Sequence, residues 1–432
     1  MLSASIGFAV AFVLIFLRVP VAIALGGVGL VGYAFLNNWT AAFSMSALAV
    51  SGSTMAYSLV VVPLFILMGN LIAGAGISRE LFRAAQAYVG HRPGGLGMAT
   101  ILSCGGFAAV CGSSVATAVT MGRVAIPAMR SYGYSDSLAT ATVAAGGTLG
   151  ILIPPSVIMV LYGIMTETHI GKLFAAGIVP AFVAIIGYTA AVSYVAIRKA
   201  GAAPRAEKAS WQERFDATKR IWSVVVMFAV VLGGIYGGFF TATEASGIGA
   251  SAAFAFAVVR RMSLGEFIEI FRISAETTAI LFALIAGASI FTEFINYSGA
   301  HRGILSLVRD SGLSPAMVIF VICLIYVILG CVLDSIAMML LTLPMFFPIV
   351  VGLGYDPVWF GIMVVMLVEL GLITPPIGMN LFVLRSIEPD ISLTTIIRGI
   401  VPFIISDLAR ILLIGLIPTI ATFLPNLLFP AP

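Results

Sequence analysis

Residues 148–156 read Thr-Leu-Gly-Ile-Leu-Ile-Pro-Pro-Ser, and residues 369–377 read Glu-Leu-Gly-Leu-Ile-Thr-Pro-Pro-Ile. In both stretches a glycine is followed four residues later by a pair of prolines, Pro154-Pro155 and Pro375-Pro376, and both pairs interrupt a long apolar block, at 135–165 and 357–385. Proline has no amide hydrogen and clashes with the preceding turn, so each pair breaks a helix and frees carbonyl groups one turn earlier. Inside a bilayer, irregular backbone is tolerated only where it is buried in protein or lines a water-filled cavity.

The composition identifies the environment of these breaks. Of 432 residues, 61% are hydrophobic and 9% are charged, whereas soluble domains carry about 25% charged residues. A soluble globular protein is therefore excluded. The apolar runs are long and do not alternate, which predicts spanning helices and not a barrel, on the order of ten to thirteen segments of about 20 residues. The N-terminal apolar stretch lacks a basic flank and a cleavage site and is expected to remain a helix.

Several function classes lack their sequence signatures. The four cysteines lie in apolar runs, which disfavours a disulfide framework or a zinc site, and the three histidines form no HExxH. The sequence contains no GxxxxGK[ST], so it does not bind ATP through a P-loop. The net charge of +4 reflects cytoplasmic loops, and we expect neither an organic cofactor nor a nucleic-acid partner. The chain is not expected to be an enzyme.

The basic residues orient the chain. Seven of the 22 lie between residues 198 and 220, which makes that segment cytoplasmic by the positive-inside rule. The other basic clusters are also placed on the cytoplasmic side, so the chain must cross the membrane an even number of times between any two of them. The apolar block at 94–127 must therefore enter and leave on the cytoplasmic side. The block at 313–348 has to enter and leave on the other side. We expect two re-entrant hairpins with tips near 111–114 and 330–335.

The chain also repeats itself at an offset of 221 residues. Beyond the Pro-Pro pairs, the matches are Pro127 with Pro348, Gly133-Tyr134 with Gly354-Tyr355, Gly150 with Gly371 and, after a one-residue insertion, 177–180 with 399–402. Each half is expected to hold five crossings, an odd number, so the two copies are oppositely oriented. We predict an all-α polytopic membrane protein with an inverted-topology repeat. Its parts are a first repeat over 1–198 with the hairpin at 94–127, a cytoplasmic connecting loop over 199–220, and a second repeat over 221–432 with the hairpin at 313–348.

The breaks and tips carry complementary chemistry. Carbonyl oxygens freed by the Pro-Pro pairs suit a hard cation, whereas the helix N-termini starting at Ser113-Ser114 and Asp334-Ser335 present N–H groups that suit an anion. Two cation sites flanking one anionic substrate at the repeat interface are therefore expected. The alternative is that these prolines and glycines only kink packed helices.

A family resemblance rests on motifs spread over residues 61–200 and 313–385. The motifs are Pro63-Leu64-Phe65-Ile66, Gly94-Gly95-Leu96, Gly112-Ser113-Ser114-Val115-Ala116, Ile126-Pro127-Ala128-Met129, Ile153-Pro154-Pro155-Ser156 and Thr374-Pro375-Pro376-Ile377-Gly378-Met379-Asn380. They resemble the DctM-type large membrane subunit of the tripartite ATP-independent periplasmic (TRAP) transporters, whose fold is of the elevator type and similar to that of the ion-transporter superfamily. The chain departs from the family pattern at Thr117, where an aspartate is frequent, and at Cys111, where serine is more usual.

The resemblance implies sodium-coupled import of an organic acid, such as a C4-dicarboxylate or sialic acid, by an elevator mechanism in the bacterial inner membrane. It implies two partners besides lipid, a periplasmic substrate-binding protein and a small four-helix membrane subunit. The first sodium ion would be held by Ser113, Ser114, Gly150, Ile153 and Pro155, and the second by Gly330, Asp334, Gly371, Thr374 and Ile377. The expected substrate-binding residues are Ser113, Ser114, Thr117, Ser156, Asp334, Ser335 and Asn380.

Several single residues have two interpretations. Asp334 is the only acid at an expected tip, which favours a structural or charge-balancing role there. Glu369 aligns with Thr148 and either serves the same pocket or pairs with an arginine elsewhere. Glu244 has capping-box spacing from Thr241 and is interpreted as structural. Arg123 either draws a carboxylate toward the pocket or, as we favour, snorkels to the surface.

Packing and interfacial roles are expected for other segments. Met338, Met339 and 346–347 are interpreted as packing residues. Amphipathic stretches at 79–90, 301–312, 262–273 and 41–53 are expected to lie in the headgroup layer or to link moving parts, the alternative being polar loops.

Three other functions are compatible with parts of the sequence. An intramembrane hydrolase using Ser113 or Ser114 needs a nearby base, yet no histidine lies in an expected span. Broken helices also build channels, but channels usually form a pore by oligomeric symmetry and not by an inverted repeat. A sodium/divalent-anion symporter working without a binding protein is the closest alternative.

Overall fold

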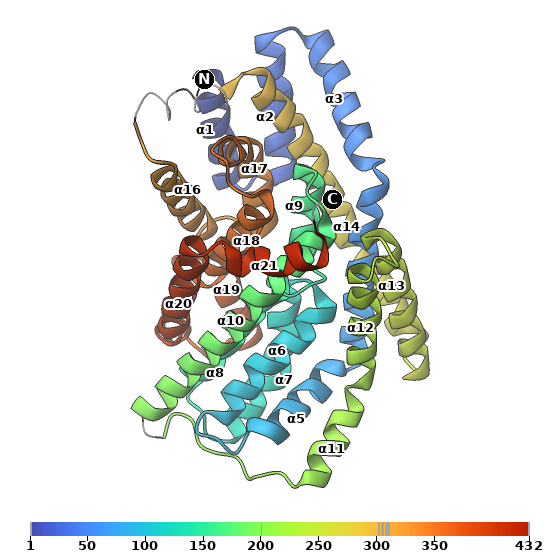
Figure 1. Cartoon of the computed structure of the whole chain (residues 1–432), viewed down its shortest axis with the longest axis vertical. Helices are drawn as coiled ribbons and strands as arrows, with labels where there is room; N and C mark the ends of the chain where they lie inside the picture. The colour runs from blue at the N-terminus through green and yellow to red at the C-terminus, as the bar shows by residue number, and fades with distance from the viewer. Residues whose placement is uncertain (1, 200, 301–302, 304–305, 307–311, 431–432) are drawn as a thin grey trace.

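The computed structural model describes all residues except 1, 200, 301–302, 304–305, 307–311 and 431–432. The part of the chain that it describes is built from helices joined by short turns (Figure 1). Seven of these helices are long and apolar enough to cross a membrane, or eight if the bent pair α11 and α12 is one span, and six further apolar helices have 10–17 residues. The expectation of an α-helical multi-pass membrane protein is confirmed.

In chain order the first half contains α1 (Leu2–Phe16), α2 (Val21–Leu36), α3 (Trp39–Thr54), the short η1 (Tyr57–Val60), α4 (Val61–Gly74), α5 (Ile77–Val89), α6 (Gly95–Cys111), α7 (Ser114–Ser131), α8 (Asp136–Leu152), α9 (Val157–Thr166) and α10 (Ile170–Arg198). The second half contains α11 (Trp211–Arg220), α12 (Trp222–Tyr236), α13 (Ala242–Val259), α14 (Leu264–Tyr297), α16 (Pro315–Gly330), α17 (Ser335–Gly352), α18 (Pro357–Ile373), α19 (Met379–Ile387), α20 (Leu393–Leu416) and α21 (Thr419–Leu428).

Both expected hairpins are present. Helices α6 and α7 lie in the lower half of the molecule and α16 and α17 in the upper half, so the two hairpins approach the middle from opposite ends (Figure 1). The first turns at Gly112, whose φ of +66° is the left-handed conformation that glycine adopts without steric cost. Ser113 and Asp334 are the N-cap residues of the returning helices α7 and α17.

The repeat is visible element by element. The breaks fall between α8 and α9 and between α18 and α19, and both Pro-Pro bonds, Pro154-Pro155 and Pro375-Pro376, are cis. Pro127 and Pro348 lie inside the returning hairpin helices α7 and α17. The paired prolines of α10 and α20 likewise lie inside their helices. The matches found in the sequence therefore occupy equivalent places in the fold.

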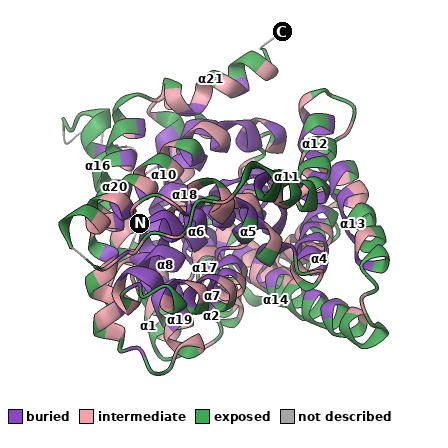
Figure 2. Cartoon of the chain, turned by 90° about the horizontal axis from the view of Figure 1, so that it is seen from below, coloured by how far each residue is buried: buried purple, intermediate pink, exposed green. Residues whose placement is uncertain are grey.

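Burial separates a central body from an outer layer. Buried residues concentrate on central helices such as α8 and α18, while helices such as α12 and α13 expose large parts of their surface (Figure 2). Many exposed side chains are large and apolar, including Phe35 at 84% and Ile197 at 76% relative accessibility. An exposed apolar surface of this kind fits a hydrocarbon environment and would be unusual in water.

Small residues permit the closest helix approaches. A Cβ atom at Gly147 of α8 would lie 2.9 Å from the Cβ of Ala118 on α7. In the outer layer, a Cβ at Gly29 of α2 would lie 2.8 Å from the α14 backbone, and one at Gly287 of α14 would overlap the carbonyl oxygen of Ala22. Close backbone packing through glycine is the common association mode of helices in membranes.

The segments predicted to be amphipathic differ in the structure that they adopt. Residues 79–90 fall almost entirely within α5, and 41–53 lie within α3. Residues 264–273 do not form a separate interfacial helix, because α14 continues without interruption from Leu264 to Tyr297, over 34 residues. The stretch 301–312 lies mostly outside the described residues. The expected connecting loop at 199–220 contains the helix α11.

The capping prediction at Glu244 is confirmed. Its carboxylate accepts hydrogen bonds from Thr241 N at 2.8 Å and Thr241 Oγ1 at 2.9 Å, while Thr241 Oγ1 accepts from Glu244 N at 3.3 Å. This reciprocal pair starts α13 and leaves Glu244 no role in the site.

The α2–α14 crossing gives a stability prediction. Gly287→Val would force the two backbones apart, and overpacking of this kind costs about 1–3 kcal/mol. We expect a lowered midpoint of thermal unfolding for the detergent-purified protein. Gly27→Val is the matched control, because a Cβ at Gly27 meets no atom within 4 Å. Equal shifts for both variants would contradict this account of the crossing.

Candidate functional site

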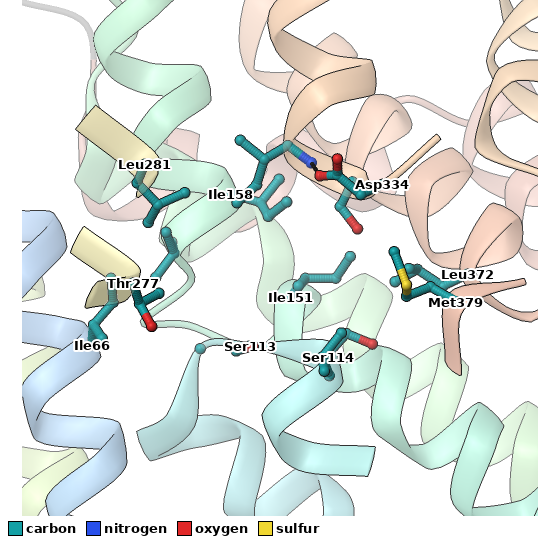
Figure 3. A pocket seen from close by; sticks show the side chains of 15 residues that line it. Ile66, Ser113, Ser114, Ile151, Ile158, Thr277, Leu281, Asp334, Leu372 and Met379 are labelled. Atoms are coloured by element: carbon teal, nitrogen blue, oxygen red, sulfur yellow. Dashed lines mark hydrogen bonds between the residues drawn. The ribbon is translucent and has the colours of Figure 1, made fainter. Parts of the chain in front are cut away.

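A cavity of about 170 Å³ lies where the two hairpin tips meet. Ser113 and Ser114 border it from one side and Asp334 from the other, with Ile151 between them (Figure 3). The α14 side chains Thr277 and Leu281 and the α4 side chain Ile66 close a third side, and residues of α9, α18 and α19 complete the lining. The structure therefore brings both predicted tips to one cavity.

The first tip rests directly on the first break. A Cβ at Gly150 would lie 2.5 Å from the carbonyl oxygen of Ser113 and 2.7 Å from Thr117 Oγ1, so only glycine allows this approach. Thr117 Oγ1 donates to the same carbonyl at 2.7 Å. Thr117 is fully buried, and its hydroxyl is occupied by the tip backbone. It supports the tip from behind and is not among the cavity-lining residues.

The backbone beyond the first break is also tied to the tip. Val157 N donates to Gly112 O at 3.5 Å. Ser156 is fully buried, donates to Ile151 O at 2.6 Å and caps α9 by accepting from Met159 N. Ser156 therefore satisfies a carbonyl that the prolines leave without a helical partner, and its contact with substrate stays a prediction. Ile153 has left helical geometry, with ψ of 124°.

The second tip repeats this arrangement in the other half. A Cβ at Gly371 would lie 2.6 Å from the backbone of Gly330, and Ile377 N donates to Cys331 O at 3.3 Å. Thr374, with ψ of 128°, holds the position of Ile153, and its hydroxyl donates to Leu370 O at 2.5 Å. In both halves, then, a glycine contact and a post-proline amide fasten the tip to the break of the same repeat.

Asp334 differs from its counterpart at the first tip by carrying a charge. Its Oδ1 accepts from Ile336 N at 3.0 Å and Ala337 N at 3.1 Å, which occupies the first donors of α17. An anionic cap at a helix N-terminus is electrostatically stabilised. Since the side chain is only partly buried, a carboxylate borders the cavity beside Ser335.

Asn380 connects the two repeats beside the first tip. It is fully buried, and its Nδ2 donates to Ser114 Oγ at 2.9 Å and to Ala144 O at 3.1 Å. Its amide is therefore bonded to the first hairpin, and it positions Ser114, which lines the cavity.

Other residues singled out in the sequence lie away from the cavity. Arg123 is exposed on α7 and is not among the lining residues, in agreement with the favoured interpretation. Met338 and Met339 are 1% and 0% accessible and pack in the core. Sequence reasoning missed Thr277 and Leu281, because nothing in the apolar pattern of α14 distinguishes the face that meets the tips.

Glu369 belongs to a buried charge cluster behind the breaks. Arg410 Nη2 lies 2.7 Å from Glu369 Oε2 and 2.8 Å from Asp407 Oδ1, and all three side chains are at most 2% accessible. Tyr188 Oη donates to Asp407 Oδ2 at 2.7 Å and lies 3.1 Å from Thr148 Oγ1. The pairing alternative for Glu369 is confirmed, and the cluster joins α8 and α10 to α18 and α20.

The donor chemistry of the site is that of neutral oxygen atoms. Among the described residues, no group of three or more His, Cys, Asp or Glu side chains is arranged so that it could hold a metal ion. A cation at either break would therefore rely on backbone carbonyl and hydroxyl oxygens, with Asp334 as the one carboxylate lining the described cavity. Oxygen donors of this type suit hard cations.

Comparison with known proteins agrees with this geometry. The family model described as "Tripartite ATP-independent periplasmic transporter, DctM component" matches residues 8–420. This chain belongs to the DctM family of TRAP transporters. Among curated DctM-family relatives, the C4-dicarboxylate large permease of Pseudomonas aeruginosa is 39% identical over 86% of both chains, and the sialic acid large permease of Vibrio cholerae is 32% identical over 96% of both. The ectoine large permease of Halomonas elongata is 34% identical over 86% of this chain and 87% of the relative.

A solved structure supports the architecture. The YdaH transporter of Alcanivorax borkumensis aligns with a TM-score of 0.58, covering 89% of this DctM chain and 88% of that chain, at 15% identity. At that identity the likeness concerns the fold alone.

The buried cluster gives a second prediction. Arg410→Met would leave Glu369 and Asp407 without a cation, and breaking a buried pair from one side costs about 3–5 kcal/mol. We expect a strongly lowered unfolding temperature or loss of folded protein. The triple variant Arg410→Met, Glu369→Gln, Asp407→Asn removes all three charges and is expected to recover most of the stability. A triple variant no more stable than the single one would contradict the charge-balance explanation.

Proposed function

We propose that this DctM-family chain is the large permease subunit of a sodium-coupled importer of an organic acid in the bacterial inner membrane. The acid would be delivered by a periplasmic binding protein, and a small four-helix membrane subunit would complete the complex. The observation that carries the proposal is the meeting of two capped hairpin tips with two Pro-Pro breaks around one cavity.

The breaks supply the oxygen atoms that a sodium ion requires. Pro154 has no amide hydrogen for Gly150 O, and Pro376 has none for Leu372 O, so these carbonyls lack their usual helical donors. We assign the first ion to Ser113, Ser114, Gly150, Ile153 and Pro155, and the second to Gly330, Asp334, Gly371, Thr374 and Ile377. The close glycine contacts at Gly150 and Gly371 bring the tip and break backbones together in each half, which supports this assignment.

The substrate carboxylate is assigned to the first tip. There the cap is the neutral Ser113, and the N-terminus of α7 offers amide groups and a positive dipole end to an anion. At the second tip the negative Asp334 already accepts from the leading amides of α17, so it would repel a carboxylate and attract a cation. Ser113 and Ser114 would then bind the acid, with Ser335 facing its other end and Asp334 acting on it through the second sodium ion.

The elevator part of the proposal rests on how the first hairpin is fastened. Asn380 ties α19 to the tip of α7, and at the other end of α7 Arg130 reaches three carboxylates. Its contacts are Asp136 at 2.7 Å, Glu388 at 3.1 Å and Asp390 at 2.6 Å. Fastened at both ends, α7 and α19 would move as one body with the site. Relatives named for C4-dicarboxylate, sialic acid and ectoine support a small carboxylate as cargo.

Sodium coupling is tested by uptake into proteoliposomes that contain this chain, the small subunit and the cognate binding protein. Radiolabelled succinate, sialic acid and ectoine would be offered, each with the binding protein loaded. We expect uptake of one of them with a sodium gradient and loss of uptake when potassium replaces sodium. Uptake that is unchanged in potassium would refute the coupling, and uptake without the binding protein would favour a sodium/divalent-anion symporter.

The charge at the second tip gives a separate prediction. Asp334→Asn keeps a capping side chain but removes the charge, so we expect the sodium concentration for half-maximal uptake to rise about tenfold, equivalent to about 1.4 kcal/mol. Asp356→Asn is the matched control, because Asp356 caps α18 in the same way, accepting from Val358 N and Trp359 N, but does not line the cavity. Equal effects of both variants would show that Asp334 acts only as a cap.

A further inference from the structure

An apolar groove of about 560 Å³ runs between α5, α6 and α12, away from the transport cavity. Its walls are formed by Leu81, Ala84, Ala85 and Tyr88 of α5, by Leu102, Ser103, Gly106 and Ala109 of α6, and by Thr218, Ile221, Val224, Val225 and Phe228 of α11, α12 and the residue between them. Ala109 lies two residues before the end of α6, so the groove extends toward the tip of the first hairpin.

Only one end of the groove is polar. There Tyr88 Oη and Thr218 Oγ1 lie 2.8 Å apart and bridge α5 to α11. Helix α11 lies at the lower end of the molecule, together with the segment that leads to it from α10 (Figure 1). Between residues 198 and 220, seven basic and three acidic residues give a net charge of +4, equal to that of the whole chain.

Arg214 lies beside Tyr88 at this polar end, and part of its guanidinium group has no hydrogen-bond acceptor in the part of the chain that the structure describes. The residue is 8% accessible, its Nε donates to Ala87 O at 3.2 Å, and its guanidinium lies 5.8 Å from the ring centroid of Tyr88. Its Nη2 is buried and has no hydrogen-bond partner among the described residues. A buried guanidinium N–H without an acceptor is costly, and phosphate oxygens are the acceptors that Arg matches best.

Neighbouring groups show that the same region is electropositive. Burial, followed by the positive charges of Arg214, Lys208 and Arg92, lowers the pKa of His91. His91 Nδ1 is likewise buried without a partner among the described residues. On the outer face of α11, Trp211 and Phe215 are 79% and 61% accessible, which is typical of a helix lying at a membrane interface.

Charge favours a lipid as the occupant. The walls of the groove are apolar and match a hydrocarbon chain, and the segment 198–220, which contributes Thr218 to the polar end, carries the basic residues that complement an anionic head group.

We propose that this groove binds one anionic phospholipid, with an acyl chain between α5, α6 and α12 and its phosphodiester group against Arg214 and the basic residues of α11. By the positive-inside rule this end of the molecule faces the cytoplasmic leaflet, where anionic lipids attract basic segments. Because α6 belongs to the first hairpin, the lipid would contact an element that also borders the transport cavity. The proposal does not depend on sodium coupling or on the identity of the transported acid.

Native mass spectrometry of the detergent-purified full chain tests the proposal, with phosphatidylglycerol and phosphatidylcholine added at equal concentration. We expect one retained phosphatidylglycerol per chain and weaker retention of phosphatidylcholine. Gly106→Leu and Ala85→Phe fill the groove from opposite walls and are expected to abolish the preference. Arg214→Gln is expected to reduce phosphatidylglycerol retention about fivefold while leaving phosphatidylcholine unchanged.

Gly27→Leu is the matched control. It fills a comparable apolar groove of about 530 Å³ between α1 and α2 that no residue of the basic segment 198–220 lines, and it is expected to keep the wild-type preference. Circular dichroism and size-exclusion profiles identify variants that remain folded, and two independent filling variants guard against misfolding of one. Equal retention of both lipids by the wild type, or undiminished phosphatidylglycerol retention in a folded filled variant, would overturn the proposal. Displacement of the lipid by the small subunit would do so as well.

Discussion

Every peptide group that leaves helical geometry within the apolar interior has to find a hydrogen-bond partner there, and this constraint organises the centre of the molecule. At the first tip, Gly112 O accepts from Val157 N, which lies just beyond the break, and the second tip uses the amide of Ile377 in the same way. Ser156 satisfies Ile151 O, a carbonyl that the prolines deprive of its donor. The tips and breaks are therefore partners, and neither could be stable in lipid without the other.

The hydrogen bonds between tip and break require close contact of the two backbones, which explains why glycine occupies the contact positions. At Gly150 and Gly371 a side chain would overlap the opposing tip, so glycine at these positions allows the approach. What remains after these bonds are formed is a short supply of carbonyl oxygens, a neutral helix N-terminus and one carboxylate. The same irregular backbone thus serves folding and function. The oxygen atoms available to an ion are those that accept no hydrogen bond within the protein.

A second set of interactions joins the two repeats. Asn380 of the second half bonds to Ser114 of the first, and Tyr188 of α10 bonds to Asp407 of α20. The cluster around Arg410 lies behind both breaks, since Thr148 and Glu369 each precede the break glycine by two residues. Through these contacts the two tips are held at a fixed separation, which is the condition for a cavity that both of them line.

The sequence predicted the hairpins, the breaks and the capping role of Glu244, because proline, glycine and capping residues act within a few positions of themselves. It could not predict that Asn380 bonds to Ser114 and Ala144, because these partners lie on other helices, or that Ser156 bonds to Ile151 O, because the break frees that carbonyl. It also separated residues 262–273 from the following span, although α14 is continuous, because polar residues on one helical face resemble an interfacial segment.

The sequence by itself determined the environment, the class of fold and the positions of the four interruptions, since composition and local backbone chemistry suffice for these. Only the tertiary structure decided which groups meet in the cavity, that Thr277 and Leu281 of α14 complete it, and that Glu369 pairs with Arg410. The physical reason is that burial and pairing depend on which helix faces cross in space. An apolar chain presents nearly the same residues on every face, so its sequence carries little information about those crossings.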